Sequence, residues 1–258
     1  METVSEAWKK TIIAILTYGL ETSPRGKLTK ELLQHTVVVN MRYPVLGIKD
    51  RSLSYRFMAA EAFWILSGDD TVIGIAPWNG RIAEFSDDGE RFFGAYGPKI
   101  AAQLNYVIDK LVADPHSRQA GLTIWRECPP QTKDVPCTVA AFANVRDGKV
   151  NIHVFMRSSD AWLGLPYDAF NFSMLGHLIC AHLNSRGLKA APGLLYLTAV
   201  SSHLYEYNWG DAYRCVDAIE TTNAETPERL FQDPVHLMEV LRLLRDTRPG
   251  DQLRWWEI

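Results

Sequence analysis

Hydrophobic and polar positions along the chain predict a mixture of helices and strands. Apolar side chains recur in several long segments at the spacing of a helix with one buried face. The segment 50–68 begins at a capping Asp or Ser and ends near Gly68, whereas the run after Pro166 is apolar almost throughout, as expected of a buried helix. Helices are therefore expected over residues 3–20, 50–68, 97–115, 166–183 and 234–246.

Strands are predicted from runs of β-branched and aromatic residues, most of them in the middle of the chain. Asp147 and Gly148 stand between two such runs, and an Asp-Gly pair is a strong signal for a tight hairpin. The strands are expected over residues 35–44, 119–125, 137–145, 149–158 and 193–205. This order of elements favours an α+β fold with a largely antiparallel sheet over a doubly wound parallel one.

Composition and charge narrow the class of protein. The chain of 258 residues is 47% hydrophobic and 22% charged, which is ordinary for a globular protein with a sizeable core. It contains no repeat, long linker or low-complexity segment, so we expect a single domain over residues 1–258. The net charge of −3 argues against broad binding to a nucleic-acid backbone, although it is compatible with one local phosphate site.

Several kinds of motif are missing from the sequence. The apolar run near the start is interrupted by charged and polar residues, which argues against a signal peptide or a membrane span. The four cysteines show no CxxC spacing, so we expect reduced thiols and a cytoplasmic protein. No HxH, HExxH, GxGxxG or GxxxxGK[ST] motif occurs; we therefore expect no metal site and neither a Rossmann nor a P-loop nucleotide site.

A few side chains have the chemistry of a catalytic site. Cys137 follows Pro136 where a strand is predicted to begin, so it is either a small buried side chain or an exposed thiolate nucleophile. Glu61 lies within the apolar segment AAEAFWIL, where it either faces water or is buried and suited to proton transfer. His203 and Tyr205 alternate along a strand and therefore share one face, where His203 is either a structural residue or a ligand.

The segment MRSSDAW places polar side chains at the end of a predicted strand. Arg157 and Asp160 are either an ion pair at a polar strand end or, with Ser158, part of an anion site, because arginine presents a fork of hydrogen-bond donors. Arg25 and Arg118 lie in turn-like segments. Each of these two is either a solvated surface charge or a further ligand of the same phosphate.

Taken in order, these segments resemble the thymidylate synthase family from about Arg25 to Tyr205. The resemblance rests on PRG, AAEAFWILSGD, AYGPKI, SRQ, PCT, MRSSDAWLGLPYDAF and HLY. It implies a large, mostly antiparallel sheet flanked by helices, with one sheet face at a homodimer interface. It also implies a reaction in which a cysteine adds to C6 of a pyrimidine nucleotide and C5 then attacks the one-carbon unit of 5,10-methylenetetrahydrofolate.

The resemblance gives roles to particular residues of this chain. Cys137 would be the nucleophile, Glu61 would organise water and proton movements, and Tyr96 would assist loss of the C5 proton. The phosphate and sugar ligands would be Arg25, Arg157, Ser158, His203, Tyr205 and, from the partner subunit, Arg118. The folate contacts would be Trp78, Asp160 and Tyr167.

Three departures from the family pattern bear on the substrate. Members that act on dUMP usually carry Asn where this chain has Asp168, His where it has Thr138, and Gln where it has Met156; all three changes resemble the phage deoxycytidylate hydroxymethylases. Cytosine donates at N4 and accepts at N3, the reverse of uracil, and a carboxyl group that shares a proton with N3 matches it. We therefore expect Asp168 to read cytosine, with Thr138 also at the nucleotide; a helix cap is the alternative for Asp168.

The expected reaction converts dCMP to 5-hydroxymethyl-dCMP, by analogy with the phage enzymes. Methylation of dCMP, hydroxymethylation of CMP and methylation of dUMP are alternative reactions, and a regulatory nucleotide-binding homologue is the non-enzyme alternative. Retention of Cys137, Glu61, Tyr96 and Arg157 argues against that last alternative. If the protein is viral, the cytoplasm is that of the host. Gln119 stands where the family often has a second phosphate-binding arginine, and the terminal LRWWEI differs from the family's apolar tail.

Overall fold

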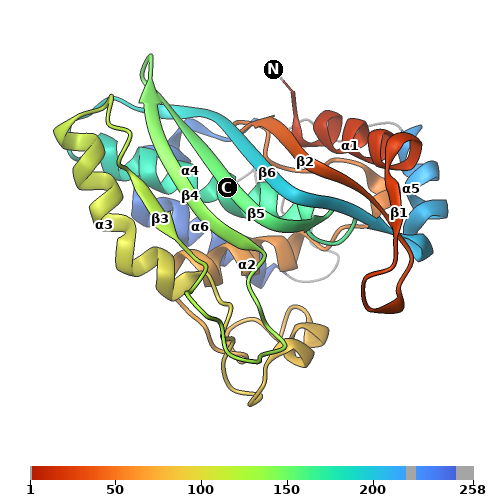
Figure 1. The fold of residues 1–258 in the computed structure, drawn as a ribbon. Helices are drawn as coiled ribbons and strands as arrows, with labels where there is room; N and C mark the ends of the chain where they lie inside the picture. The colour runs from red at the N-terminus through yellow and green to blue at the C-terminus, as the bar shows by residue number, and fades with distance from the viewer. Residues whose placement is uncertain (1, 219–224, 248–258) are drawn as a thin grey trace.

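A sheet of six strands forms one layer of the molecule (Figure 1). The structure, a computed structural model, describes residues 2–218 and 225–247. The strands lie in the order β1-β2-β6-β5-β4-β3, and only β5 and β6 are parallel neighbours among them. Their bounds are β1 (Leu20–Thr22), β2 (Thr29–Asn40), β3 (Gly121–Thr123), β4 (Thr138–Arg146), β5 (Lys149–Asp160) and β6 (Ala191–Tyr205).

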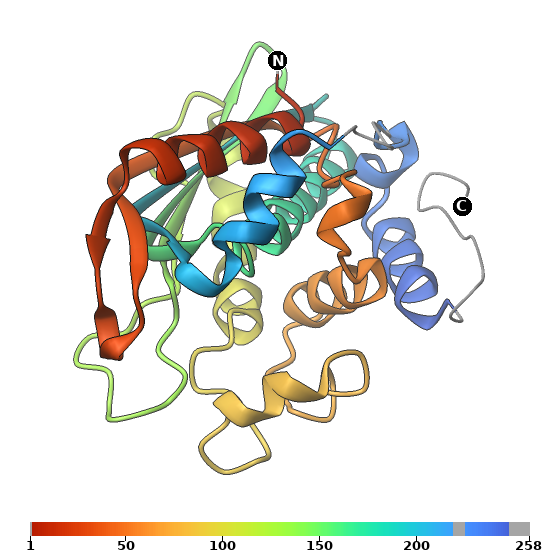
Figure 2. The same ribbon diagram turned by 90° about the vertical axis from the view of Figure 1, so that its right-hand side faces the viewer.

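The helices gather on one face of this sheet, as the two views show (Figure 1, Figure 2). The α-helices are α1 (Val4–Tyr18), α2 (Tyr55–Leu66), α3 (Gly97–Ala113), α4 (Leu165–Ser185), α5 (Trp209–Val216) and α6 (Pro234–Asp246). Short 3-10 helices are η1 (Pro24–Gly26), η2 (Lys49–Arg51), η3 (Gly80–Phe85), η4 (Glu206–Asn208) and η5 (Glu228–Phe231). The expected α+β fold with a largely antiparallel sheet is confirmed.

The elements differ from the prediction mainly at their ends and in two short additions. Strand β2 begins at Thr29, six residues before the predicted start, because it pairs with β6 from Thr29 opposite Tyr205 to Asn40 opposite Leu194. Strand β1 and helix α5 were not predicted. The first has only three residues and the second only eight, and both are shorter than the segment of roughly 11–18 residues over which a hydrophobic period is read.

Helix α4 is the centre of the helical layer. It packs on β5 and β6 with one side and against α2 and α6 with another, and most of its side chains are buried. Gly176 permits its close approach to the sheet, because a Cβ atom there would lie 2.5 Å from Met41 Sδ. A helix that is apolar nearly all round is stable only in such a buried position, which is why the run after Pro166 predicted one.

The turn before α4 is fixed from two sides. The buried Trp8 of α1 donates its indole N–H to Ala161 O at 2.7 Å, and Arg51 Nη2 donates to Trp162 O at 2.6 Å. The Arg51 guanidinium also lies 4.2 Å from the centre of the Trp162 ring. These contacts set the position from which α4 and its first turn begin.

No helix within residues 2–218 and 225–247 combines the length and the apolar character that a membrane crossing requires.

Replacing Trp8 by Phe should test how much this turn depends on α1. The change removes the indole donor and leaves the Ala161 carbonyl without it in the core, so the free energy of unfolding should fall by about 1–3 kcal/mol. Urea unfolding measures the change. Tyr18→Phe is the control, because the Tyr18 side chain is 76% exposed; equal stability of both variants would contradict the prediction.

Candidate functional site

A cavity of about 150 Å³ lies between α2, the start of α4 and the segment that connects α2 to α3. Three of the side chains that line it carry carboxyl groups: Glu61 from α2, Asp134 from the loop before β4, and Asp168 from α4. No lysine, arginine or histidine is among the residues found to line it. The full lining is Glu61, Trp64, Ile65, Ile82, Phe85, Phe92, Gly94, Ala95, Tyr96, Asp134, Asp168 and Asn171.

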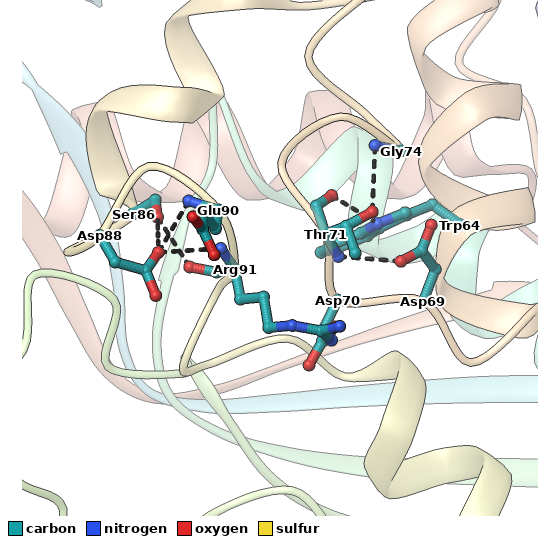
Figure 3. Close-up of polar contacts among 9 residues, drawn as sticks. All are labelled: Trp64, Asp69, Asp70, Thr71, Gly74, Ser86, Asp88, Glu90 and Arg91. Carbon is teal, nitrogen blue, oxygen red and sulfur yellow. Dashed lines mark hydrogen bonds and ion pairs between the residues drawn. The ribbon is translucent and has the colours of Figure 1, made fainter.

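Residues 67–96, which we call the lobe, form one wall of the cavity and are held by two hydrogen-bonded turns (Figure 3). In the first, Asp69 Oδ1 accepts from Thr71 N at 2.9 Å, and Thr71 O accepts from the Trp64 indole at 3.1 Å. In the second, Asp88 Oδ1 accepts from Arg91 N at 2.9 Å, and an ion pair from Arg91 to Asp70 joins the two turns. The wall is therefore built by local polar contacts.

The loop that carries the cysteine is tied to this lobe. Asp134 Oδ2 accepts from Gly94 N at 2.7 Å. Asp87 accepts from Lys133 N at 3.1 Å and from the Thr132 hydroxyl. Three residues after Asp134, the chain reaches Cys137, so the position of the thiol relative to the cavity depends on these contacts.

Cys137 is half-buried at the start of β4, beside the end of β5. Its Sγ lies 3.7 Å from Ser158 Oγ, and its carbonyl accepts from Arg157 N at 2.8 Å. Burial raises the pKa of the thiol, and Asp168 adds to this, whereas Arg157 and the hydrogen bond from Ser158 oppose it. A thiol in this state needs a base when a substrate is bound, because the thiolate is the nucleophile.

The Arg157 guanidinium reaches back over the loop before the cysteine. Its Nε donates to Pro136 O at 3.0 Å and its Nη2 to Val135 O at 2.9 Å, while Nη1 donates to Ser158 Oγ at 3.0 Å. The side chain is exposed, so it can meet an anion while it holds the loop. The structure thus brings Arg157, Ser158 and Cys137 together.

A second polar group forms where β6 ends. Arg25 Nη2 donates to the Tyr205 hydroxyl at 3.3 Å, and the rings of His203 and Tyr205 meet edge to face at 5.2 Å between centres. Arg25 sits in η1 with a φ of 55°, the left-handed region that residues other than glycine rarely adopt. His203 lies opposite Asp160 in the register of β5 and β6, which places this group beside the strand end that carries Ser158.

Glu61 lies on the cavity wall rather than on an outer surface of α2. Asn171 Nδ2 donates to Glu61 Oε2 at 2.7 Å, joining α2 to α4. Burial raises the pKa of Glu61 to about 7, and this hydrogen bond opposes the shift only in part. A carboxyl group with such a pKa exchanges protons readily near neutral pH.

Asp168 stands in the first turn of α4 and does not cap the helix. Gly164 occupies the N-cap position, and no side chain caps this end, which removes the alternative reading of Asp168. Burial raises the pKa of Asp168 to about 8, with further contributions from Glu61 and Asp160. At neutral pH, Glu61 and Asp168 therefore bind protons more tightly than two free carboxyl groups would.

Tyr96 and Thr138 meet across the cavity mouth. The Tyr96 hydroxyl accepts from Thr138 N at 3.3 Å, and the Tyr96 ring stacks on Phe172 of α4 at 6.2 Å. Burial raises the pKa of Tyr96, as does the proximity of Asp168 and Cys137, so its hydroxyl stays neutral. The Thr138 hydroxyl is buried and makes no hydrogen bond within the described residues.

The expected folate contacts, Trp78, Asp160 and Tyr167, are not among the residues that line the cavity. Trp78 donates its indole N–H to Arg245 O at 2.7 Å. Asp160 Oδ1 accepts from Trp162 N and Leu163 N at 2.8 and 3.0 Å, and the Tyr167 hydroxyl accepts from Ser54 N at 3.4 Å. Arg118 is exposed in the turn before β3. The C-terminal residues LRWWEI lie outside the described residues.

Two polar residues of the cavity wall were missed by the sequence reasoning, Asp134 and Asn171. Asn171 follows Asp168 by three positions, so helical spacing places both on one face of α4 and was a usable signal. Asp134 lies in an irregular loop that has no periodicity, and its place on the wall depends on its bond to Gly94. No group of three or more His, Cys, Asp or Glu within residues 2–218 and 225–247 could hold a metal ion.

Comparison with known proteins agrees with this fold. A family model described as thymidylate synthase matches residues 6–233. The chain therefore belongs to the thymidylate synthase family, and the resemblance noted in the sequence is confirmed.

Similar proteins include both hydroxymethyltransferases and thymidylate synthases by name. The chain is 26% identical to a deoxyuridylate hydroxymethyltransferase of Bacillus phage SP01, with 87% of this chain and 63% of that protein covered. It is 28% identical to a protein of the same name from Pseudomonas phage M6, with 75% and 57% covered. A thymidylate synthase of Pseudomonas fluorescens (strain SBW25) is 25% identical, with 84% and 83% covered. The chain thus spans less than two thirds of the length of both phage proteins.

Protonation of the cavity carboxyl groups should make stability depend on pH. The pKa values of Glu61 and Asp168 rise from 4.5 and 3.8 to about 7 and about 8, so the folded state binds these protons more tightly than the unfolded chain. Their contribution to stability is complete below pH 4 and is lost as the pH rises through 7 and 8. The stability of Asp168→Asn, which cannot ionise, should therefore increase relative to that of the parent between pH 5 and pH 8.5, by on the order of 2 kcal/mol.

Urea unfolding at both pH values measures this difference. Glu84→Gln is the matched control, because Glu84 is exposed on η3. A difference that is the same at pH 5 and pH 8.5 would show that Asp168 acts on stability by packing rather than through its charge.

Proposed function

We propose that residues 1–258 form one catalytic domain that transfers a one-carbon unit from 5,10-methylenetetrahydrofolate to C5 of a pyrimidine nucleoside monophosphate. The preferred substrate is dCMP and the product is 5-hydroxymethyl-dCMP. Membership of the thymidylate synthase family supports the reaction class. The observation that carries the choice of base is Asp168, which does not cap α4 and lines a cavity with no cationic side chain among its lining residues.

In this reaction Cys137 forms a bond from Sγ to C6 of the base, and the pair of electrons moves toward C4 and N3. Arg157 and Ser158 bind the phosphate beside the thiol, a role that their contacts with each other and with Cys137 support. Arg25, which donates to the Tyr205 hydroxyl at the end of β6, is a further ligand. After C5 has bonded to the one-carbon unit, the C5 proton leaves with help from the neutral Tyr96 hydroxyl. Glu61 carries protons between the cavity water and the base.

The base is read by Asp168. Its carboxyl group accepts from N4–H with one oxygen, and a single proton joins its other oxygen to N3. The raised pKa of Asp168 provides that proton at neutral pH, and its transfer to N3 lets the ring accept electrons when the thiol adds at C6. The absence of a lysine, arginine or histidine among the lining residues fits a base edge that itself donates hydrogen bonds.

The folate co-substrate fits the same cavity. Its reduced pterin ring presents N–H donors, and the carboxyl groups of the wall that do not read the base, those of Glu61 and Asp134, are acceptors. Trp78, Asp160 and Tyr167 remain our candidates for its outer contacts. The names of the phage relatives support hydroxymethyl rather than methyl transfer. We place the protein in the cytoplasm, that of the host if the gene is viral.

Hydroxymethylation of dUMP is the second candidate, because both phage relatives are named for deoxyuridylate. A protonated Asp168 can match uracil too, donating to O4 and accepting from N3–H. An ionised Asp168 cannot, because it has no donor for O4. Because both base edges use the Asp168 proton, turnover of either nucleotide should fall as that proton is lost above pH 8, and the two candidates are distinguished by which nucleotide gives a product.

Product masses test this proposal directly. The protein is mixed with 5,10-methylenetetrahydrofolate and, separately, with dCMP, CMP, dUMP and UMP, and the products are identified by mass spectrometry. We expect addition of CH₂O, about 30 Da, to dCMP, with turnover that falls as Asp168 loses its proton above pH 8. Addition of CH₂, about 14 Da, would make the protein a methylase, and a product from dUMP alone would overturn Asp168 as a cytosine reader.

Asp168→Asn gives the matched variant for this assay. Its amide donates to O4 and accepts from N3–H, so turnover of dCMP should fall at least a hundredfold and turnover of dUMP should rise. Glu84→Gln, at an exposed position outside the cavity lining, is expected to behave as the parent.

We also propose that the protein acts as a homodimer, with Arg118 reaching the phosphate of the partner subunit's site. The sheet face opposite the helices supports this, because it exposes large apolar side chains: Leu33 at 60%, Phe142 at 42%, Phe155 at 48% and Val200 at 65%. A monomer seldom leaves such side chains together on one face. Arg118 is exposed at the β3 edge of the sheet and is free to act outside its own subunit.

Val200→Glu should therefore give a monomer in analytical ultracentrifugation, because it places a charge in the middle of the proposed contact. Loss of Arg118 from the partner's site should raise KM for dCMP at least tenfold. Val235→Glu is the control, because Val235 is 75% exposed on α6 and away from the sheet. A parent protein that is monomeric and fully active would contradict the dimer.

A further inference from the structure

Asn171, which lines the cavity, has a buried acceptor that makes no hydrogen bond within the described residues. Asn171 is 6% exposed on α4 and belongs to the cavity lining. Its Nδ2 donates to Glu61 Oε2 at 2.7 Å, whereas its Oδ1 is buried and makes no hydrogen bond within the described residues. An acceptor left without a partner in the protein interior costs about 1–3 kcal/mol, so this oxygen needs a donor.

The orientation of this amide follows from its neighbour. The NH₂ group of Asn171 faces Glu61, which is the orientation that the ionised carboxylate requires because it can only accept hydrogen bonds. The carbonyl oxygen then points away from Glu61. The same contact that holds Glu61 therefore fixes the direction of the free acceptor.

Water is the donor that this position admits. Asn171 follows Asp168 by three residues, which is about 4.5 Å farther along the helix axis, behind the group that reads the base. The cavity of about 150 Å³ has room for ordered water, and Glu61, Asp168 and Tyr96 offer it further polar partners. A buried water with two to four such partners is well held.

We propose that Asn171 Oδ1 holds the water that attacks the methylene group at C5, and that Asn171 thereby selects the hydroxymethyl product over the methyl product. This inference rests on the proposed function. The water oxygen forms a bond to the methylene carbon, and the π pair of the exocyclic double bond moves into the ring. When this electron pair returns to form the C5–C6 double bond, the bond from C6 to Cys137 Sγ breaks and the thiolate leaves. The proton of the water passes to Glu61. No hydride is transferred, so tetrahydrofolate leaves without oxidation.

Asn171→Leu tests this role, because leucine has a similar size and no polar atom. The readout is the amount of each product per tritium released from [5-³H]dCMP, since release of the C5 proton precedes the choice of product. We expect the amount of hydroxymethyl product formed per tritium released to fall at least tenfold. Added 2-mercaptoethanol should trap the waiting methylene group as a thioether at C5. Asn171→Ser, whose hydroxyl accepts and donates, should keep the hydroxymethyl product.

Ser173→Ala is the matched control on the same helix, because Ser173 Oγ donates to the Ala169 carbonyl within α4. It should leave the product ratio unchanged. Asn171→Val replaces the leucine variant if thermal unfolding shows that the latter is not folded. A folded apolar variant with the parent's ratio, or a serine variant with the leucine variant's ratio, would overturn the role of Asn171. A parent protein that releases tritium from dCMP but forms no hydroxymethyl product would refute the proposed function instead.

Discussion

The hydrogen bond from Asn171 to Glu61 joins the buried helix α4 to α2 at the wall of the cavity. Around it, carboxyl groups lie in a place that disfavours their charge, and no cationic side chain is among the lining residues to offset the cost. The pKa values of Glu61 and Asp168 rise as a result. The arrangement persists because α4 is packed between the sheet and two helices, and its burial outweighs the cost of holding polar groups there.

The thiol and the cavity wall are held by separate parts of the chain that contact each other. Asp134 and Asp87 tie the loop before Cys137 to the lobe, and Arg157 holds the same loop from the β5 side. The loop is thus restrained from both directions although it has no regular secondary structure of its own. Arginine suits this position because one guanidinium can satisfy two carbonyl groups and still present a donor outward.

Whether Asp168 carries a proton affects both the choice of base and the chemistry at C5. A neutral Asp168 can match either pyrimidine, whereas an ionised one matches only a cytosine that carries the proton on N3. The same low polarity that keeps Asp168 neutral keeps the Tyr96 hydroxyl neutral and makes Glu61 a proton carrier near pH 7. Substrate recognition and proton transfer therefore depend on one physical property of the cavity, its burial without a countercharge.

The sequence by itself determined the main helices, the hairpin at Asp147-Gly148, the buried character of α4 and the family, because periodicity and short motifs are local properties of the chain. It also singled out Cys137, Glu61 and Asp168 by residue type. Tertiary structure alone decided that Glu61 faces a cavity, that Asp168 is not a helix cap, and that Asp134 joins the wall. Those outcomes depend on which segments meet in space and on how much water they exclude, and neither is encoded in the spacing of residues along the chain.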